Sequence, residues 1–165
     1  MKHALYTFAL IPALLASTAA QAQDTSYLSL SGGVYDVLDN DEAFDLRAEY
    51  RDADPVFWDV KPWMGVEATS EGTLWGGGGL LLDLNLSDDV YLAPSVGVGL
   101  YGQGSSDKDL GSAIEFRSQI EGGYQFDNGQ RVGAAFSHMS NWGLDDKNPG
   151  TEILGIYYHI PVGSL

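Results

Sequence analysis

Apolar and polar residues alternate with a period of two along much of the chain after Ala22. The clearest segment is 43–51, AFDLRAEYR, in which every second side chain is charged. Its apolar face would carry Phe44, Leu46, Ala48 and Tyr50, and its charged face Asp45, Arg47, Glu49 and Arg51. A helix would spread these charges around its circumference, whereas successive residues of a strand point to opposite faces. The pattern therefore predicts a β-strand with one apolar and one charged face.

The same alternation recurs along the chain, and turn-forming residues separate the segments that carry it. Residues 114–126, IEFRSQIEGGYQF, repeat it clearly. Asp, Asn, Gly, Ser and Pro gather at the breaks, as in LDNDE at 38–42 and DNGQ at 127–130. The chain thus predicts an all-β fold of about eight strands. We expect them near residues 25–37, 42–52, 58–69, 73–86, 89–103, 110–127, 130–141 and 150–161.

The length of the predicted strands points to a membrane barrel. Strands of soluble sandwiches usually have about five or six residues, whereas a strand that crosses a membrane needs about 9–11. In a small membrane barrel the apolar face meets lipid and the polar face fills the interior. Strand length and an even strand count favour an eight-stranded antiparallel transmembrane β-barrel, and so does the N-terminal export signal described in the next paragraph. A soluble lipocalin-like barrel, with its charged faces toward water, explains the alternation as well and stays open at this point.

The N-terminus has the features of a secretory signal peptide. Lys2 precedes an apolar run at 4–16, and the small-x-small triplet Ala20-Gln21-Ala22 follows. We expect cleavage after Ala22, which divides the chain into a signal peptide, 1–22, and an outer-membrane barrel, 23–165. A retained N-terminal anchor is the alternative, although the apolar run is too short for a helix that spans a bilayer. The chain has no cysteine, so the exported product would be held together without disulfides.

The charge of the chain is strongly acidic. It has eight Lys and Arg residues against 23 Asp and Glu residues, a formal net charge of −15, and removal of 1–22 would take away Lys2 and no acid. Nucleic-acid binding needs a basic surface, so the composition excludes it. Simple attraction to anionic lipid headgroups is excluded for the same reason, unless divalent cations lie between the two surfaces.

A histidine, a serine and a glutamate fall on the apolar faces of the last two predicted strands. His138 and Ser140 share the face of Phe136, and Glu152 shares the face of Leu154. In a membrane barrel these residues would lie on the outside, near the outer ends of adjacent antiparallel strands. A polar group on a lipid-facing wall is costly, which suggests that function requires it there.

The spacing of these three residues is compatible with nucleophilic catalysis. Residues two apart on a strand lie about 6.5–7 Å apart along it, a gap that a histidine ring bridges to take a hydroxyl proton. A glutamate on the neighbouring strand would hold the other ring nitrogen and stabilise the imidazolium. An interface histidine beside an unrelated serine and a surface glutamate fits the spacing equally, so both interpretations stay open on spacing alone.

The segment 138–152, HMSNWGLDDKNPGTE, resembles the signature of the lipid A 3-O-deacylases of the PagL type. The matching positions are His138, Ser140, Asn141, Gly143, Asn148, Pro149, Gly150 and Glu152. Residues 114–136 are similar in character to the strands before that signature, and the first half of the chain matches only in pattern. The resemblance implies an outer-membrane serine esterase with an eight-stranded barrel, which hydrolyses the 3-O-linked 3-hydroxyacyl ester of lipid A.

The resemblance also implies a role for each matching residue. Ser140 would be the nucleophile, His138 the general base and then the general acid, and Glu152 the carboxylate that orients the histidine. Asn148 and the backbone N–H of Gly143 resemble the donors of the family's oxyanion hole.

Around this set, Asn141 resembles a supporting residue. A hydrophobic wall for the acyl chain would be formed by Ala134, Phe136, Leu154 and Ile156. No cofactor is expected and no metal site, because His3 leaves with the signal peptide and His138 and His159 fall on opposite faces of their strands. The expected partners are lipid A of lipopolysaccharide and the outer membrane, with a homodimer left open. A non-enzymatic structural or adhesive outer-membrane barrel is the alternative function.

Overall fold

The computed structural model describes residues 25–39 and 42–163. Their strands are β1 (Ser26–Tyr35), β2 (Ala43–Arg51), β3 (Val60–Thr69), β4 (Leu74–Leu82), β5 (Leu84–Asn85), β6 (Val90–Gly102), β7 (Ile114–Gln125), β8 (Arg131–Ser140) and β9 (Thr151–Val162). Within these ranges, no helix is long and apolar enough to cross a membrane. The predicted signal peptide and its cleavage site at Ala22 lie outside the described residues.

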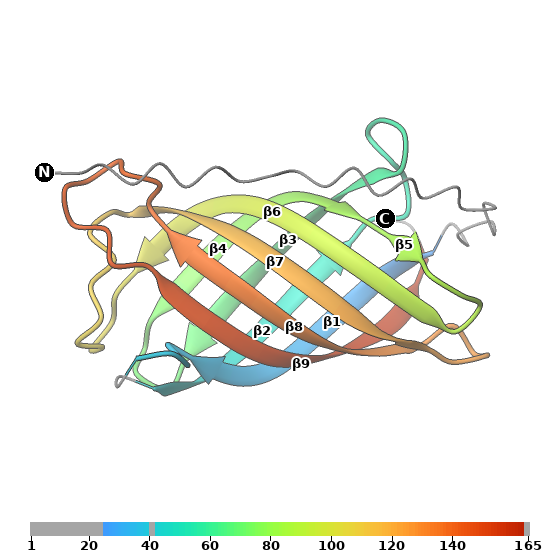
Figure 1. The fold of residues 1–165 in the computed structure, drawn as a ribbon, viewed down its shortest axis with the longest axis horizontal. Helices are drawn as coiled ribbons and strands as arrows, with labels where there is room; N and C mark the ends of the chain where they lie inside the picture. The colour runs from blue at the N-terminus through green and yellow to red at the C-terminus, as the bar shows by residue number, and fades with distance from the viewer. Residues whose placement is uncertain (1–24, 40–41, 164–165) are drawn as a thin grey trace, which may run out of the picture.

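The strands pair antiparallel with their neighbours, and the sheet closes on itself (Figure 1). The strand order is β4-β3-β2-β1-β9-β8-β7-β6-β5, and β4 also pairs with β6. β4 and β5 both pair with β6 and are separated only at Asp83, so they act as one interrupted strand of the barrel. The fold is therefore a closed eight-stranded antiparallel β-barrel, which confirms the predicted fold class.

Two strands begin later than the sequence predicted, and a turn precedes each of them. β3 begins at Val60 instead of near 58, because Trp58 has a left-handed φ of 52° and Phe57 forms a bridge back to Val60. β7 begins at Ile114 instead of near 110, where Gly111 has a φ of 90° and Leu110 is buried. The connection before β3 thus extends over residues 52–59, longer than the gap expected between the strands near 42–52 and 58–69.

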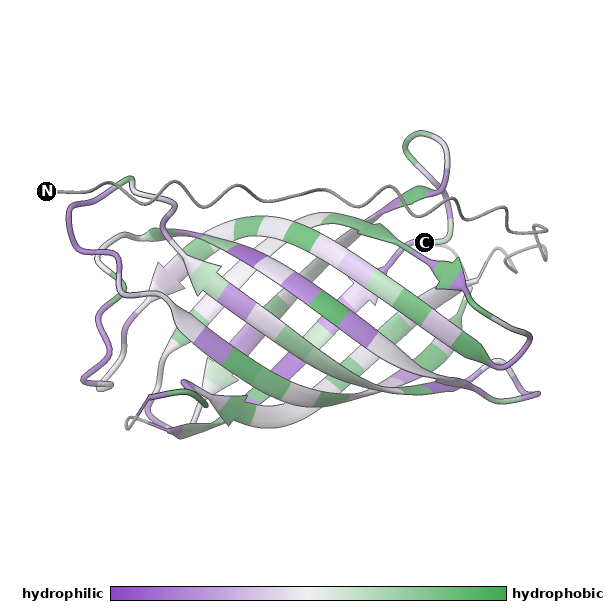
Figure 2. Cartoon of the chain, viewed as in Figure 1, coloured by the Kyte–Doolittle hydropathy of each residue, from purple (hydrophilic) through white to green (hydrophobic). Residues whose placement is uncertain are grey.

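The two faces of the barrel wall divide as the alternation predicted. Apolar and polar residues alternate along most of the strands in Figure 2, and the outward-facing apolar ones are exposed, among them Leu46 (54%), Met64 (64%) and Ile120 (53%). The alternating charged residues point inward and are buried. An exposed apolar wall around a polar interior is the membrane-barrel arrangement and the reverse of a soluble lipocalin-like barrel.

The interior is held together by ion pairs and hydrogen bonds that join strands across the barrel. Arg47 Nε lies 3.0 Å from Asp45 and 2.9 Å from Glu67, while its Nη1 donates to Ser137 Oγ on β8 at 3.1 Å. Arg117 pairs with Glu49, and its guanidinium lies 4.3 Å from the ring centre of Trp63. Removing one partner of such a buried pair typically costs about 3–5 kcal/mol, because the other charge is left uncompensated.

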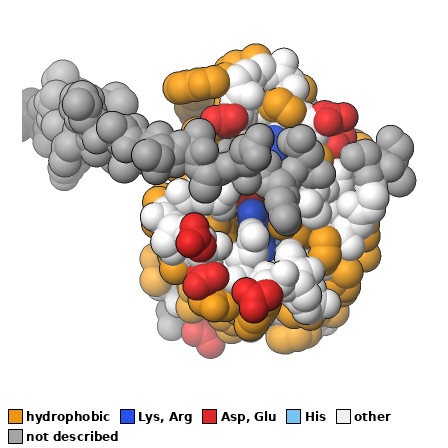
Figure 3. All heavy atoms as spheres, turned by 90° about the vertical axis from the view of Figure 1, so that its right-hand side faces the viewer, with side chains coloured by type: hydrophobic (Ala, Val, Ile, Leu, Met, Phe, Trp, Pro, Cys, Tyr) orange, Lys and Arg blue, Asp and Glu red, His pale blue; other side chains and the backbone are white. Residues whose placement is uncertain are grey.

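The two ends of the barrel differ in the length of their connections. The connections after β1, β3, β6 and β8 gather at one end, on the left of Figure 1, and include 103–113 and 141–150. If the mature N-terminus is periplasmic, this is the outer end. Below it, inside the barrel, lie Tyr35, Leu110, Met139 and Ile153 of a buried apolar cluster. Figure 3 looks at the opposite end, where acidic side chains lie among apolar ones.

Candidate active site

His138 and Glu152 lie opposite each other on the outer surface of β8 and β9. The β8–β9 pairing places His138 directly across from Glu152, and His138 Nδ1 lies 2.9 Å from Glu152 Oε1. Because a carboxylate only accepts hydrogen bonds, this contact assigns the proton to Nδ1 and leaves Nε2 with a lone pair. The histidine side chain is 43% exposed and the glutamate side chain 24% exposed. The pair is therefore open to whatever surrounds the barrel.

Ser140 lies two residues farther along the same face, at the last residue of β8. It is partly exposed, and its neighbour on β7 is Phe116. Among the hydrogen bonds of the described residues none joins Ser140 to His138, so the serine hydroxyl is adjacent to the histidine without yet being bonded to it. Such contacts are often long in an enzyme without its substrate. The structure thus brings the three predicted residues onto one exposed surface.

Gly150 lies against the ring of His138. It has a φ of 70°, a backbone conformation that is unfavourable for residues with a Cβ atom. A Cβ at this position would lie 2.7 Å from His138 Cε1. Only a glycine lets the loop pass this close to the histidine, so Gly150 helps to fix the position of the ring.

Asn141 organises the connection between β8 and β9. It is fully buried, and its side-chain amide donates to Leu110 O at 2.9 Å and to Lys147 O at 2.7 Å. Its Oδ1 accepts the backbone N–H of Gly143 at 2.9 Å. These bonds tie 141–150 to the connection between β6 and β7.

The two predicted oxyanion donors differ in availability. Asn148 Oδ1 accepts the backbone N–H of Asn141 at 3.1 Å, and no hydrogen bond within the described ranges uses its Nδ2. The N–H of Gly143, in contrast, is directed at Asn141 Oδ1. Asn148 therefore has unused donors on a side chain that is bonded to the residue after Ser140, whereas the Gly143 amide would first have to leave its present acceptor.

The predicted apolar wall lies along the barrel next to the pair formed by His138 and Glu152. Phe136 pairs with Leu154, and Ala134 pairs with Ile156. These two pairs follow the pair of His138 and Glu152 at intervals of two residues along the strands. Three of these side chains are substantially exposed: Phe136 (41%), Leu154 (47%) and Ile156 (58%). The four residues form a continuous hydrophobic strip that starts at the polar set and extends toward the middle of the barrel.

A second apolar surface borders Ser140 on its other side, and sequence reasoning did not single it out. The rings of Phe116 and Trp142 meet edge to face, with centres 5.4 Å apart. Trp142 is 80% exposed and has a φ of 53°. The only sequence signal was that Trp142 follows Ser140 by two residues, because the register that brings Phe116 beside Ser140 appears only in the folded barrel.

Two lysines join the loops at this end of the barrel, and sequence reasoning gave them no role. Lys108 pairs with Asp36, at 2.9 Å, and with Asp39. Burial lowers the pKa of the Lys108 ammonium, but the hydrogen bonds to Asp39 and Asp36 outweigh it, and the pKa is raised overall. Lys147 pairs with Asp109 at 2.8 Å, and this hydrogen bond lowers the pKa of the Asp109 carboxyl.

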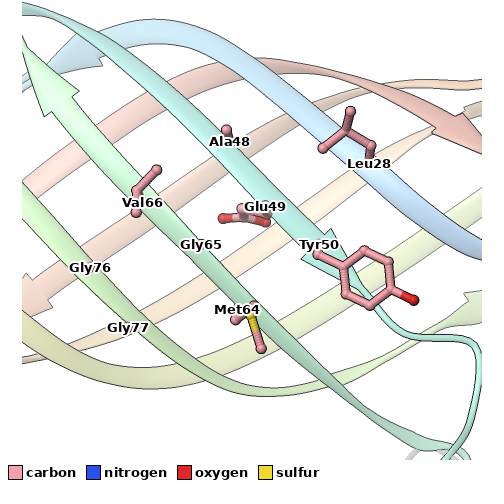
Figure 4. Close-up of a pocket in the computed structure, with 9 residues that line it drawn as sticks. All are labelled: Leu28, Ala48, Glu49, Tyr50, Met64, Gly65, Val66, Gly76 and Gly77. Atoms are coloured by element: carbon pink, nitrogen blue, oxygen red, sulfur yellow. The ribbon is translucent and has the colours of Figure 1, made fainter. Parts of the chain in front are cut away.

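Two further features of the described residues bear on alternative sites. No group of three or more His, Cys, Asp or Glu residues within them is placed to hold a metal ion. A shallow apolar groove of about 350 Å³ is lined by residues that include Leu28, Met64 and Gly76 (Figure 4). Its lining residues lie on β1 to β4, and β3 is on the opposite side of the barrel from β8. The groove is therefore separate from the set around His138.

Known proteins resemble this chain over most of its length. The sequence model of the lipid A 3-O-deacylase (PagL) family matches residues 44–161. The lipid A deacylase PagL of Bordetella bronchiseptica is 27% identical over 173 aligned positions, which cover 92% of each chain. That of Pseudomonas aeruginosa is 37% identical over 73 residues, which span 44% of this chain and only 42% of the relative.

Solved structures support the same fold. The crystal structure of the outer membrane enzyme PagL superposes with a TM-score of 0.66 at 24% identity, and covers 82% of this chain and 99% of that one. The neisserial surface protein A superposes with a TM-score of 0.58 at 12% identity, over 84% of this chain and 96% of that one. These likenesses show the barrel, while the match over residues 44–161 shows the family. The chain belongs to the lipid A 3-O-deacylase (PagL) family of ester hydrolases, which act in the outer membrane.

Proposed function

We propose that this protein hydrolyses the 3-O-linked 3-hydroxyacyl ester of lipid A, with Ser140 as nucleophile, His138 as base and Glu152 as orienting carboxylate. The observation that carries the proposal is the 2.9 Å contact between His138 Nδ1 and Glu152 Oε1 on the outer wall of the barrel. A polar pair on a lipid-facing surface is costly. A function exerted on a lipid explains why the pair lies outside and not in the barrel.

The tautomer of His138 sets the direction of proton transfer. Its Nε2 lone pair is free to take the proton of Ser140 Oγ as the oxygen attacks the ester carbonyl carbon. Glu152 then stabilises the imidazolium through Nδ1 without being protonated itself. Collapse of the tetrahedral intermediate breaks the bond to the sugar oxygen, which leaves with the proton from Nε2.

The second half of the reaction repeats these steps with water. His138 Nε2 takes a proton from a water molecule as its oxygen attacks the acyl-enzyme at the same carbonyl carbon. The bond to Ser140 Oγ breaks, and Nε2 returns the proton to that oxygen. The products are free 3-hydroxy fatty acid and the deacylated glycolipid, and no cofactor is consumed.

Asn148 is the better placed of the two proposed oxyanion donors. Its side chain is held by the backbone N–H of Asn141 at Oδ1, so its Nδ2 is oriented and unused. Loss of one such donor costs about 10²–10³ in kcat in other hydrolases. Gly143 contributes only if its N–H leaves Asn141 Oδ1, which a developing negative charge would favour.

The substrate reaches this site sideways, within the outer leaflet. The strip of Phe136, Leu154 and Ile156 provides an apolar surface along which an acyl chain lies parallel to the strands. Phe116 and Trp142 provide a second apolar surface on the opposite side of Ser140. Because the substrate carries several acyl chains, two apolar surfaces beside one nucleophile allow one chain to be cut while another is held.

Mass spectrometry of lipid A provides the test. Cells that express the native chain should lose one 3-hydroxyacyl mass from lipid A, and cells that express Ser140→Ala should not. Heat-modifiable migration in a detergent gel serves as the control that both barrels are folded. Unchanged lipid A in both cultures, with folded barrels in the outer membrane, would contradict the proposal and favour the non-enzymatic barrel. The homodimer stays a prediction, which cross-linking in outer membranes would test.

A further inference from the structure

The barrel carries very little positive charge that a ligand could reach. Among the basic residues of the described ranges, the side chains of Arg47, Arg51, Lys61, Lys108, Arg117 and Arg131 are at most 10% exposed. The side chain of Lys147 is 56% exposed. Lys147 is thus the single exposed cation within 25–39 and 42–163. Its surroundings are acidic, with Asp145 and Asp146 immediately before it.

The backbone of Lys147 is fixed next to the proposed catalytic residues. Its carbonyl oxygen accepts the side-chain N–H of Asn141, the residue after Ser140, at 2.7 Å. On the other side Gly111 packs so closely that a Cβ there would lie 1.9 Å from the same oxygen. The next residue, Asn148, is held by the N–H of Asn141. The ammonium group of Lys147 therefore extends from a fixed point at the rim of the site.

We propose that Lys147 binds a phosphate group of the substrate and so positions the sugar whose ester Ser140 attacks. This inference rests on the proposed function, because the phosphate belongs to the proposed substrate: lipid A is a glucosamine disaccharide that carries phosphate groups. An ammonium is a point-like phosphate ligand. Within the described residues, a phosphorylated lipid that approaches this acidic barrel finds one exposed cation, on a residue whose backbone is bonded to Asn141, the neighbour of the proposed nucleophile. Lys147 thereby distinguishes phosphorylated from dephosphorylated glycolipids.

Asp109 occupies the phosphate position when no substrate is bound. Its carboxylate lies 2.8 Å from Lys147 Nζ, and both side chains are substantially exposed. Exposed ion pairs contribute little, about 0–1 kcal/mol, so a phosphate with more negative charge displaces the carboxylate. Asp109 competes with the substrate for the same ammonium. Its Oδ1 also accepts the N–H of Gly111, an interaction that an asparagine side chain at this position would keep.

Steady-state kinetics with two substrates tests this role. The purified full-length protein would be assayed in detergent micelles on diphosphoryl lipid A and on lipid A from which both phosphates have been removed. We expect Lys147→Met to raise KM about fivefold on the diphosphoryl substrate, with kcat unchanged, and to leave both constants unchanged on the dephosphorylated one. Lys147→Arg should restore the native KM, and Asp109→Asn should lower it on the diphosphoryl substrate only.

Other outcomes would overturn the inference. An equal change on both substrates, or a fall in kcat alone, would assign Lys147 to loop structure. A preference for diphosphoryl lipid A that survives Lys147→Met and disappears with EDTA would assign phosphate binding to a divalent cation.

Binding measured without turnover separates this inference from the proposed function. In a Ser140→Ala background, native mass spectrometry should show weaker binding of diphosphoryl lipid A when Lys147→Met is added. If the native chain deacylates neither substrate, the proposed function fails, whereas equal binding with and without Lys147→Met overturns the phosphate site alone.

Discussion

Replacement of Gly150 by alanine tests whether the position of the His138 ring is essential. The added Cβ would lie 2.7 Å from His138 Cε1, whereas carbon atoms in favourable contact are about 3.5–4.0 Å apart. The ring therefore has to move by about 1 Å, or the loop has to move away from it. Either change disturbs the 2.9 Å contact between His138 and Glu152.

The expected effect on catalysis is large and the effect on stability small. A misplacement of about 1 Å near the reacting atoms costs on the order of 10²-fold in rate. The left-handed φ of 70° at Gly150 adds about 1–2 kcal/mol of backbone strain when the residue is alanine. The barrel, held by its closed sheet, should still assemble. We therefore expect Gly150→Ala to fold and to lose about 99% of its deacylase activity.

Gly72→Ala is the matched control. Gly72 has a φ of 78°, close to that of Gly150, but a Cβ there would meet no atom within 4 Å. It lies in the turn between β3 and β4, away from the site. Deacylation of lipid A would be measured for both variants beside heat-modifiable migration. If both variants fold and keep equal activity, the contact of Gly150 with His138 has no role in catalysis.

Four further changes address other parts of the molecule. Glu152→Gln should lower kcat about 10²-fold or more, because a neutral amide stabilises the imidazolium less than a carboxylate does; the Michaelis constants would show KM nearly unchanged. Asn148→Ala should lower kcat about 10²-fold through loss of an oxyanion donor. If adding Asn148→Ala to the Ser140→Ala protein weakened the binding of lipid A by the same factor, that role would be contradicted. Met64→Arg places a charge on the lipid-facing wall and should destabilise the inserted barrel by about 2–4 kcal/mol, measured by urea unfolding in vesicles. The hydrogen bond to Lys147 lowers the pKa of the Asp109 carboxyl, so the ion pair is present above the ordinary carboxyl pKa and is lost only as the pH falls through a lower value, which an NMR titration of the carboxyl would show.

The alternation of residues predicted the barrel and its two faces well. In 43–51 the charged residues were assigned to one face, and in the structure Asp45, Arg47 and Glu49 are buried while Phe44 and Leu46 are exposed. The assignment of residues to faces was correct because successive side chains of a strand must point to opposite faces. Alternation alone could not decide whether the charged face pointed inward. The structure decides it, because the charged side chains of this segment lie inside the closed barrel and the apolar ones outside.

The details of the site depend on loop conformations that the sequence did not reveal. Trp142, Gly143 and Gly150 all have positive φ values, which turn the chain. As a result Asn141 Oδ1 accepts the N–H of Gly143, and Gly150 packs against the ring of His138. Likewise, no local pattern in the sequence indicates which residue pairs with Lys147. Its partner Asp109 lies 38 residues away in the sequence. Contacts of this kind follow from the packing of two loops, for which local patterns carry no signal.

The proposed active site on the exterior would also divide the roles of the polar residues. Inside the barrel, Arg47 and its partners are fully enclosed, so they stabilise the fold and cannot meet a substrate. Outside, His138 remains 43% exposed, and water can compete for its hydrogen bonds until a lipid covers it. Charge stabilisation is stronger in a medium of low dielectric constant, so the substrate itself supplies part of the environment that its hydrolysis requires. Changes inside should therefore affect assembly, changes outside should affect turnover, and the acyl chains should influence kcat as well as KM.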